Sequence, residues 1–172
     1  MGSGAQKLTR RGFAGGLVAG LVVGLQPETG GQSMQEIQAR APGDARTSLH
    51  QEIALAATSA RIEAALLDAK QFAAFTGLAA TIDAHEGGAF SLFRGMIVGR
   101  NVELVSGRRI VQAWRPADWE PGVYSLVRFE LQAKGSGTLV VLDHTGFPPG
   151  DFAHLSSGWQ EHYWEPLKKL FG

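Results

Sequence analysis

The sequence predicts a single α+β domain in which a long C-terminal helix lies against a curved antiparallel sheet. Three observations predict it. Large apolar residues recur at gaps of three and four after Asp151, which is the period of one helix face. Apolar and polar residues alternate in successive segments between Ala80 and Thr145, which is the period of a strand. The links between these segments are mostly short, so consecutive strands are expected to pair with each other. An apolar helix face can then cover an apolar sheet face to form one core.

The domain is predicted to begin with a strand over Ser48–Ala57, in which larger residues alternate with small and polar ones. Thr58 or Ser59 then offers a hydroxyl N-cap for a helix that continues to Leu67. Asp68 can cap a second short helix. We therefore expect two short helices directly after the first strand.

Six further strands are predicted, which gives a sheet of about six to seven strands. They are Ala80–Glu86, Phe90–Phe93, Met96–Val105, Arg109–Arg115, Val123–Leu131 and Thr138–Thr145. Gly87 and Gly88 predict a hairpin, and Gly95 predicts a bulge or turn. The longest connection between strands is the loop Pro116–Gly122.

The closing helix is predicted to start at Asp151, which follows Pro-Pro-Gly and can cap the helix with its carboxylate. Gly158 would allow close approach of a backbone or a ligand, and Pro166 should bend the helix near His162. Two interpretations stay open, a plain core helix and the lid of a cavity, and the residue pattern alone favours the plain core helix. Its apolar face is expected to comprise Phe152, Leu155, Trp159, Tyr163, Leu167 and Leu170.

Composition excludes several classes of function. The 16 basic and 16 acidic residues give a formal charge of zero, whereas a nucleic-acid binder usually has a basic excess. The chain has no cysteine, so disulfides and thiolate metal sites are excluded. Asp143 and His144 are adjacent and would point to opposite faces of a strand, so they are not expected to form a dyad. No metal-binding or serine-nucleophile motif is present, and we predict no cofactor, no metal site and no catalytic residue.

The first 33 residues differ from the rest and are predicted to be an export signal. The segment Thr9–Phe13 (TRRGF) resembles the twin-arginine motif, which would make the twin-arginine export machinery a partner and the protein periplasmic. The apolar run Gly12–Leu25 has about 14 residues, too few to span a bilayer, so no integral membrane span is expected. The alternative is that Met34 is the true start and the protein is cytoplasmic. Residues 34–47 are expected to be a linker, and 48–172 the domain.

Three stretches resemble a known family: Gly87–Leu104, Ile110–Ser125 and Leu142–Leu170. The order of elements is similar to the helix-grip fold shared by START, polyketide-cyclase and pollen-allergen-like proteins. Within that group the chain resembles bacterial homologues of the activator of the 90-kilodalton heat-shock-protein ATPase. The resemblance spans roughly Ser48 to the end, and its most specific part is the tail with Gly158-Trp159 and Pro166-Leu167. It implies an apolar ligand between helix and sheet, and so favours the cavity lid.

Five residues are candidates for binding such a ligand. Trp114, Trp159 and Tyr163 combine a large apolar surface with a hydrogen-bonding tip. Gln112 and Arg100 lie in otherwise apolar strand faces and would orient the polar end of a ligand if those faces line the cavity. The sequence does not decide which strand faces do so.

Three functions follow, in order of preference. The first is non-enzymatic binding of a small hydrophobic molecule. The second is a co-chaperone-like interaction module, which a genuine export signal would disfavour. The third is a cyclase or hydrolase that uses polar groups of the cavity, with Asp143, His144 and Arg100 as the residues to test.

Overall fold

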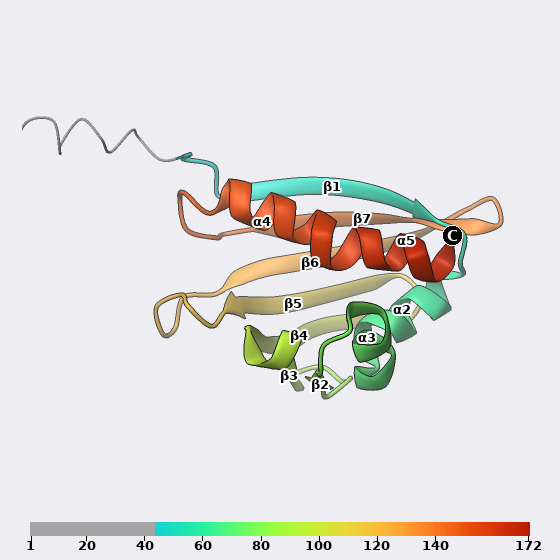
Figure 1. Cartoon of the computed structure of the whole chain (residues 1–172), viewed down its shortest axis with the longest axis horizontal. Coiled ribbons are helices and arrows are strands. Elements are labelled where there is room, and N and C mark those ends of the chain that lie inside the picture. The colour runs from blue at the N-terminus through green and yellow to red at the C-terminus, as the bar shows by residue number, and fades with distance from the viewer. Residues whose placement is uncertain (1–43) are drawn as a thin grey trace, which may run out of the picture. The chain divides into compact units, whose positions relative to one another are not determined.

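Seven antiparallel strands form one sheet in the computed structural model, which describes residues 44–172 (Figure 1). Their order across the sheet is β1-β7-β6-β5-β4-β3-β2, so the first strand lies beside the last and the other strands follow as a meander. The strands are β1 (Ser48–Leu55), β2 (Thr81–Ile82), β3 (Ala89–Leu92), β4 (Ile97–Val105), β5 (Arg109–Pro116), β6 (Ser125–Lys134) and β7 (Gly137–Thr145). The predicted α+β helix-grip fold is confirmed.

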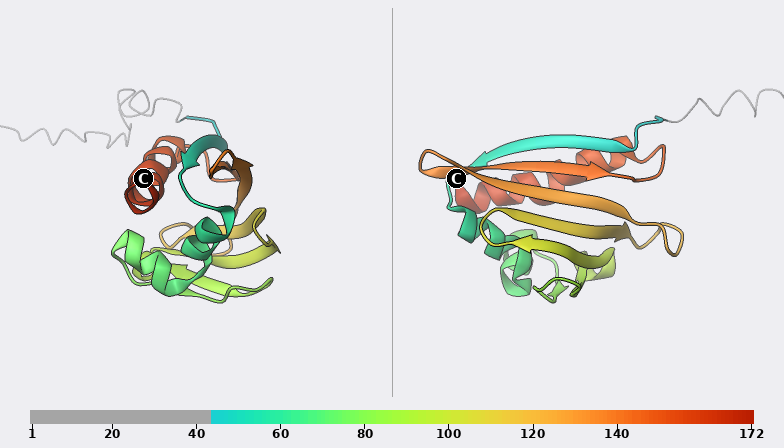
Figure 2. Two further views of the ribbon diagram at one scale, coloured as in Figure 1. Left: turned by 90° about the vertical axis from the view of Figure 1, so that its right-hand side faces the viewer. Right: turned by 180° about the vertical axis from the view of Figure 1, so that it is seen from behind.

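The helices lie on one side of this sheet. Helices α2 (Ser59–Leu67) and α3 (Ala69–Thr76) follow β1, as predicted, and Asp68 caps α3 by accepting a hydrogen bond from the backbone N–H of Gln71. The C-terminal helix runs for 20 residues and lies along the sheet on the same side as α2 and α3 (Figure 2). It comprises α4 (Phe152–Trp159), the π-helical segment η2 (Gln160–Trp164) and α5 (Glu165–Phe171).

The core fills the space between the C-terminal helix and the inner face of the sheet. Side chains alternate along each strand, as β6 shows: Val127, Phe129 and Leu131 are buried, whereas Leu126 and Arg128 are exposed. The helix contributes residues that are almost fully buried, including Trp164 and Leu167 at 1% and 0% exposure. Burial of large apolar side chains on both layers explains why the helix docks on this face.

The outer face of the sheet carries a row of cross-strand ion pairs. Asp143 on β7 accepts hydrogen bonds from His50 on β1 at 2.7 Å and from Arg128 on β6 at 2.6 Å. Partial burial acts to raise the pKa of Asp143, but these two hydrogen bonds outweigh it and lower that pKa. The hydrogen bond that His50 donates to Asp143 also raises the pKa of His50. Asp143 therefore faces away from the core, opposite to His144, as the alternation of a strand requires.

The C-terminal helix differs from its predicted form in two respects. Asp151 precedes it, but its side chain makes no capping hydrogen bond. Pro166 lacks an N–H and would clash with the carbonyl of His162, and the preceding turn is π-helical. A π-turn shifts the register of the residues after it. The buried face therefore includes Trp164 and Phe171, and Leu170, which was expected there, is 47% exposed.

The second strand also differs from the prediction. Ala80–Glu86 was expected to be extended, but β2 covers only Thr81–Ile82 and a turn follows. The predicted signal segment, residues 1–33, lies outside the described residues, as does most of the predicted linker. None of the helices within residues 44–172 combines the length and apolar character needed to cross a membrane.

Candidate functional site: an apolar pocket under the C-terminal helix

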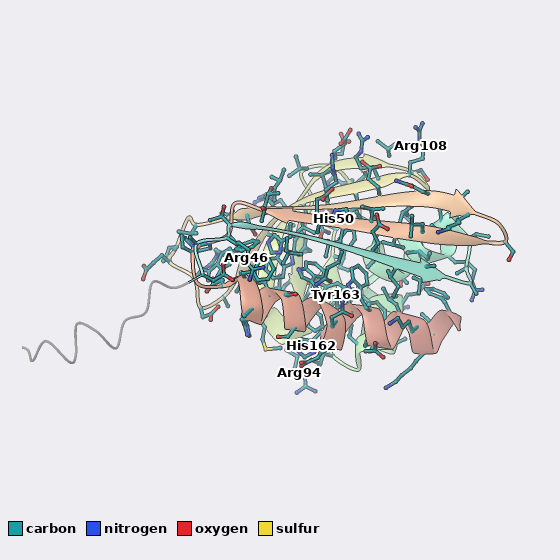
Figure 3. The ribbon with its side chains drawn as sticks, turned by 90° about the horizontal axis from the view of Figure 1, so that it is seen from above. Arg46, His50, Arg94, Arg108, His162 and Tyr163 are labelled. Carbon is teal, nitrogen blue, oxygen red and sulfur yellow. The ribbon has the colours of Figure 1, made fainter. Side chains whose placement is uncertain are left out.

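A pocket of about 370 Å³ lies between the first half of the C-terminal helix and the end of β5. The 3₁₀ turn η1 (Phe93–Gly95) and the start of β4 form one side of it, and the loop after β5 forms another. In Figure 3, Tyr163 lies on the sheet side of the helix. The lining residues are Phe93, Met96, Ile97, Trp114, Pro116, Ala117, Asp118, His154, Leu155, Gly158, Trp159, His162 and Tyr163.

Aromatic side chains make up much of the pocket wall. The rings of Trp114 and Trp159 stack with centroids 5.7 Å apart, and Trp159 contacts Tyr163 with centroids 4.3 Å apart. Phe93 meets Tyr163 edge to face at 5.5 Å. All four side chains are at most 5% exposed. Such edge-to-face and offset contacts hold the rings in fixed orientations, so the wall is preformed.

The turn that positions Phe93 has an unusual backbone. Phe93 and Arg94 have φ values of 51° and 58°, and Gly95 follows with φ of 93°. Left-handed geometry is unfavourable for residues with a side chain, and packing of Phe93 against Tyr163 and Phe72 offsets that cost. The predicted turn at Gly95 is present, but Phe93 belongs to the turn and not to a strand.

A buried polar network lies directly behind the aromatic wall. The indole Nε1–H of Trp159 donates to Nδ1 of His144 at 3.1 Å. Nε2 of His144 therefore carries the proton and donates to the hydroxyl of Ser125 at 2.6 Å, which donates in turn to the carbonyl of Trp114 at 3.0 Å. His144 is fully buried, and burial lowers its pKa to about 3, so the imidazole is neutral at pH 7. The network fixes the orientation of Trp159 and ties it to β5.

One buried hydrogen-bond donor in the wall has no acceptor within the described part of the chain. The Nε1–H of Trp114 is buried and has no hydrogen-bond partner among residues 44–172. It lies near the Tyr163 hydroxyl, on which it acts to lower the pKa, but the contact falls outside hydrogen-bond geometry. Burial is the larger effect and raises the pKa of Tyr163, so the phenol keeps its proton. A buried donor without an acceptor costs about 1–3 kcal/mol, which a ligand could recover.

Three of the five sequence-predicted binding residues line the pocket, namely Trp114, Trp159 and Tyr163. Gln112 and Arg100 do not. Gln112 is on the inner face but lies deeper along β5, where its amide donates to Asn101 Oδ1 at 3.0 Å. Arg100 is on the outer face of β4 and donates to the carbonyl of Gly87 at 2.9 Å.

Sequence reasoning missed Phe93, Met96 and the two histidines at the pocket mouth, His154 and His162. The two histidines are eight residues apart, which on a regular α-helix would offset them by about 80°. Both line the same pocket since the π-turn lies between Trp159 and Glu165. No pattern in the sequence signals a π-turn other than Pro166 itself.

The three residues named for the cyclase or hydrolase hypothesis do not lie together in the pocket. Asp143 and Arg100 are on the outer face, and His144 is buried behind Trp114 and Trp159, so none of the three lines the pocket. Among residues 44–172, no group of three or more histidine, aspartate or glutamate side chains is placed to hold a metal ion.

A curved sheet, a long helix across it and a pocket between the two define a helix-grip domain. The sequence model of the family described as "Activator of Hsp90 ATPase homolog 1-like protein" matches residues 56–172, and the chain belongs to this family.

Relatives in two eukaryotes agree with this assignment. The activator of 90 kDa heat shock protein ATPase homolog 1 of Homo sapiens is 31% identical over 99 residues, which is 58% of this chain and 29% of that protein. The homolog of Dictyostelium discoideum is 37% identical over 99 residues, 57% of this chain and 26% of that protein. The chain therefore spans less than a third of the length of these curated relatives.

Solved structures show the same fold. The crystal structure of an HSP90 activator from Plasmodium falciparum matches with a TM-score of 0.69 and 25% identity, covering 73% of this chain and 96% of that one. The Aha1 dimer from Colwellia psychrerythraea matches with a TM-score of 0.62 and 17% identity, with the same coverage of 73% and 96%. At 17% identity the second likeness concerns the fold alone.

Proposed function

We propose that the domain binds a small apolar molecule in the pocket under its C-terminal helix. The observation that carries this proposal is the preformed aromatic pocket of about 370 Å³, whose size falls within the range of small-molecule sites, roughly 300–1,000 Å³. A few polar groups converge on it, as in known ligand sites, and the unpartnered indole N–H of Trp114 is one of them.

Gly158 offers a direct test, because it lines the pocket and no atom lies within 4 Å of a Cβ added there. The change Gly158→Leu puts an isobutyl group into open space beside Trp159. The matched control is Ala153→Leu, which adds a similar group to an exposed position of the same helix that does not line the pocket. We expect Gly158→Leu to weaken binding at least tenfold and Ala153→Leu to leave it unchanged.

The measurement uses the four tryptophans, two of which line the pocket. Fluorene, a planar hydrocarbon, is titrated into the full chain while tryptophan fluorescence is followed. Native mass spectrometry of the protein purified from its own source asks in parallel whether a small molecule co-purifies. Equal affinity of Gly158→Leu and the wild type for fluorene would count against this pocket as the site.

A second candidate function is interaction with an Hsp90-type chaperone, which membership of the activator family favours. The named activators are more than three times longer than the region they share with this chain, so their activity does not transfer by similarity alone. The test is to add the purified chain to an Hsp90 chaperone and to measure both complex formation and ATP hydrolysis. Stimulation of hydrolysis would support this function, and no binding at tens of micromolar would dismiss it.

The segment that resembles a twin-arginine signal affects the choice between these two functions, because export would separate the domain from a cytoplasmic chaperone. We propose that residues 1–33 act as an export signal and that the mature domain is periplasmic. Mass spectrometry of the native N-terminus tests this. A cytoplasmic protein that begins at Met34 would overturn it and would favour the chaperone interaction.

A further inference from the structure

We infer that the ligand is a neutral ring compound that presents a carbonyl oxygen to the hydroxyl of Tyr163. This inference rests on the proposed function and specifies the chemistry of its ligand. It makes Tyr163 the residue that selects among apolar molecules of similar size.

The pocket wall contains two buried side chains that carry hydrogen-bond donors. Tyr163 and Trp114 are 5% and 4% exposed, and both line the pocket. The indole N–H of Trp114 lies near the phenol oxygen, which leaves the phenolic proton for a ligand. Among residues 44–172 the indole N–H of Trp114 has no hydrogen-bond partner. A carbonyl oxygen has two lone pairs and no proton, so it can accept from both the phenol and the indole.

The charges of the lining favour a neutral ligand. The ionisable residues of the lining are Asp118, His154 and His162 besides Tyr163, and no lysine or arginine is among them. A carboxylate placed against Tyr163 would be buried without a permanent cation, which is unfavourable. Asp118 would also repel it. A ketone or ester oxygen avoids both costs, so the acceptor is neutral.

The aromatic contacts of the wall favour a planar ligand. Trp114 and Trp159 stack on each other, and Phe93 meets Tyr163 edge to face. Aromatic rings prefer offset and edge-to-face contacts with other rings. A planar ring system therefore gains more from this wall than a flexible chain does, because it loses little conformational freedom on binding.

The test compares fluorenone with fluorene, which differ only in a carbonyl against a methylene group. Affinities of both for the full chain are measured by tryptophan fluorescence, in the wild type and in Tyr163→Phe. The matched control is Tyr124→Phe, which changes the other tyrosine of the chain, 49% exposed and outside the pocket lining. Circular dichroism verifies that each variant is folded.

In the wild type, fluorenone should bind about three to ten times more tightly than fluorene, as expected for one neutral hydrogen bond. Tyr163→Phe should abolish this preference, and Tyr124→Phe should preserve it. The difference in hydrophobicity between the probes cancels when the ratio of their affinities is compared between the wild type and Tyr163→Phe.

Two results would overturn the inference and are distinguishable. In the first, both probes bind but the wild type shows no preference for fluorenone, or Tyr163→Phe keeps that preference. The predicted contact between the carbonyl and Tyr163 is then wrong, whereas the binding of apolar molecules in the pocket is still supported. If neither probe binds to the wild type, the proposed function fails for planar ligands and the inference fails with it.

Discussion

Replacing His144 by glutamine should make the domain less sensitive to acid. His144 is fully buried, and burial lowers its pKa from 6.5 to about 3. In the unfolded chain the imidazole is exposed to water and takes up a proton below its ordinary pKa of about 6.5. Between these two pKa values the unfolded state binds more protons than the folded state, so stability falls as the pH falls.

The magnitude follows from the two pKa values. Lowering the pH from about 8 to about 5.5 protonates roughly ten elevenths of the unfolded imidazole and none of the folded one, which costs about 1.4 kcal/mol. The loss continues by about 1.4 kcal/mol for each further pH unit down to the folded pKa. Glutamine has no such titration, and its amide can accept from Trp159 and donate to Ser125 as the imidazole does.

The assay is urea unfolding at pH 8 and pH 5.5, followed by circular dichroism, for the wild type, His144→Gln and His154→Gln. His154 is exposed at the pocket mouth, so its replacement is the matched control. The drop in unfolding free energy between the two pH values should be smaller by about 1.4 kcal/mol in His144→Gln than in the other two proteins. An equal drop in the unfolding free energy of all three proteins would refute the claim that the His144 imidazole is buried and neutral.

Two further predictions concern stability and surface titration. Gly158→Ala should raise the unfolding free energy by about 0.4–1 kcal/mol in urea titrations, because its Cβ meets no atom within 4 Å and alanine favours the helix. Gly99→Ala should lower the unfolding free energy instead, since its Cβ would collide with the carbonyl of Ala113. A higher unfolding free energy for Gly99→Ala than for Gly158→Ala would contradict this description of the packing. Asp143→Asn should lower the pKa of His50, because the hydrogen bond that His50 donates to the Asp143 carboxylate raises that pKa. The measurement is an NMR titration of the His50 ring protons. An unchanged His50 titration would show that the pair does not form in solution.

Much of the fold follows from local periodicity. The alternation in β6 and β7 and the spacing of Leu155, Trp159 and Tyr163 suffice to place the sheet, the helix and the face by which each packs. The two short helices at the start of the domain were also predictable, and Asp68 caps α3 as expected, whereas the side chain of Thr58 before α2 makes no capping hydrogen bond.

The pocket was less predictable, because it depends on departures from periodicity. The π-turn before Pro166 shifts the register of the helix, and the left-handed turn at Phe93 turns a ring into the wall. Both conformations are unfavourable in isolation, so only tertiary packing selects them. Gln112 and Arg100 show the same limit: strand alternation separates the two faces but does not say which part of a face borders a cavity.

The most direct test of the pocket is an NMR titration of the wild-type chain with fluorene, observing the four indole N–H signals. The signals of Trp114 and Trp159 should shift, whereas that of Trp164, which donates to Gln51 and does not line the pocket, should stay in place. Saturable shifts of Trp114 and Trp159 alone would place a guest between helix and sheet. Unchanged signals for both, at fluorene concentrations up to its solubility, would contradict the binding of an apolar ligand at this site.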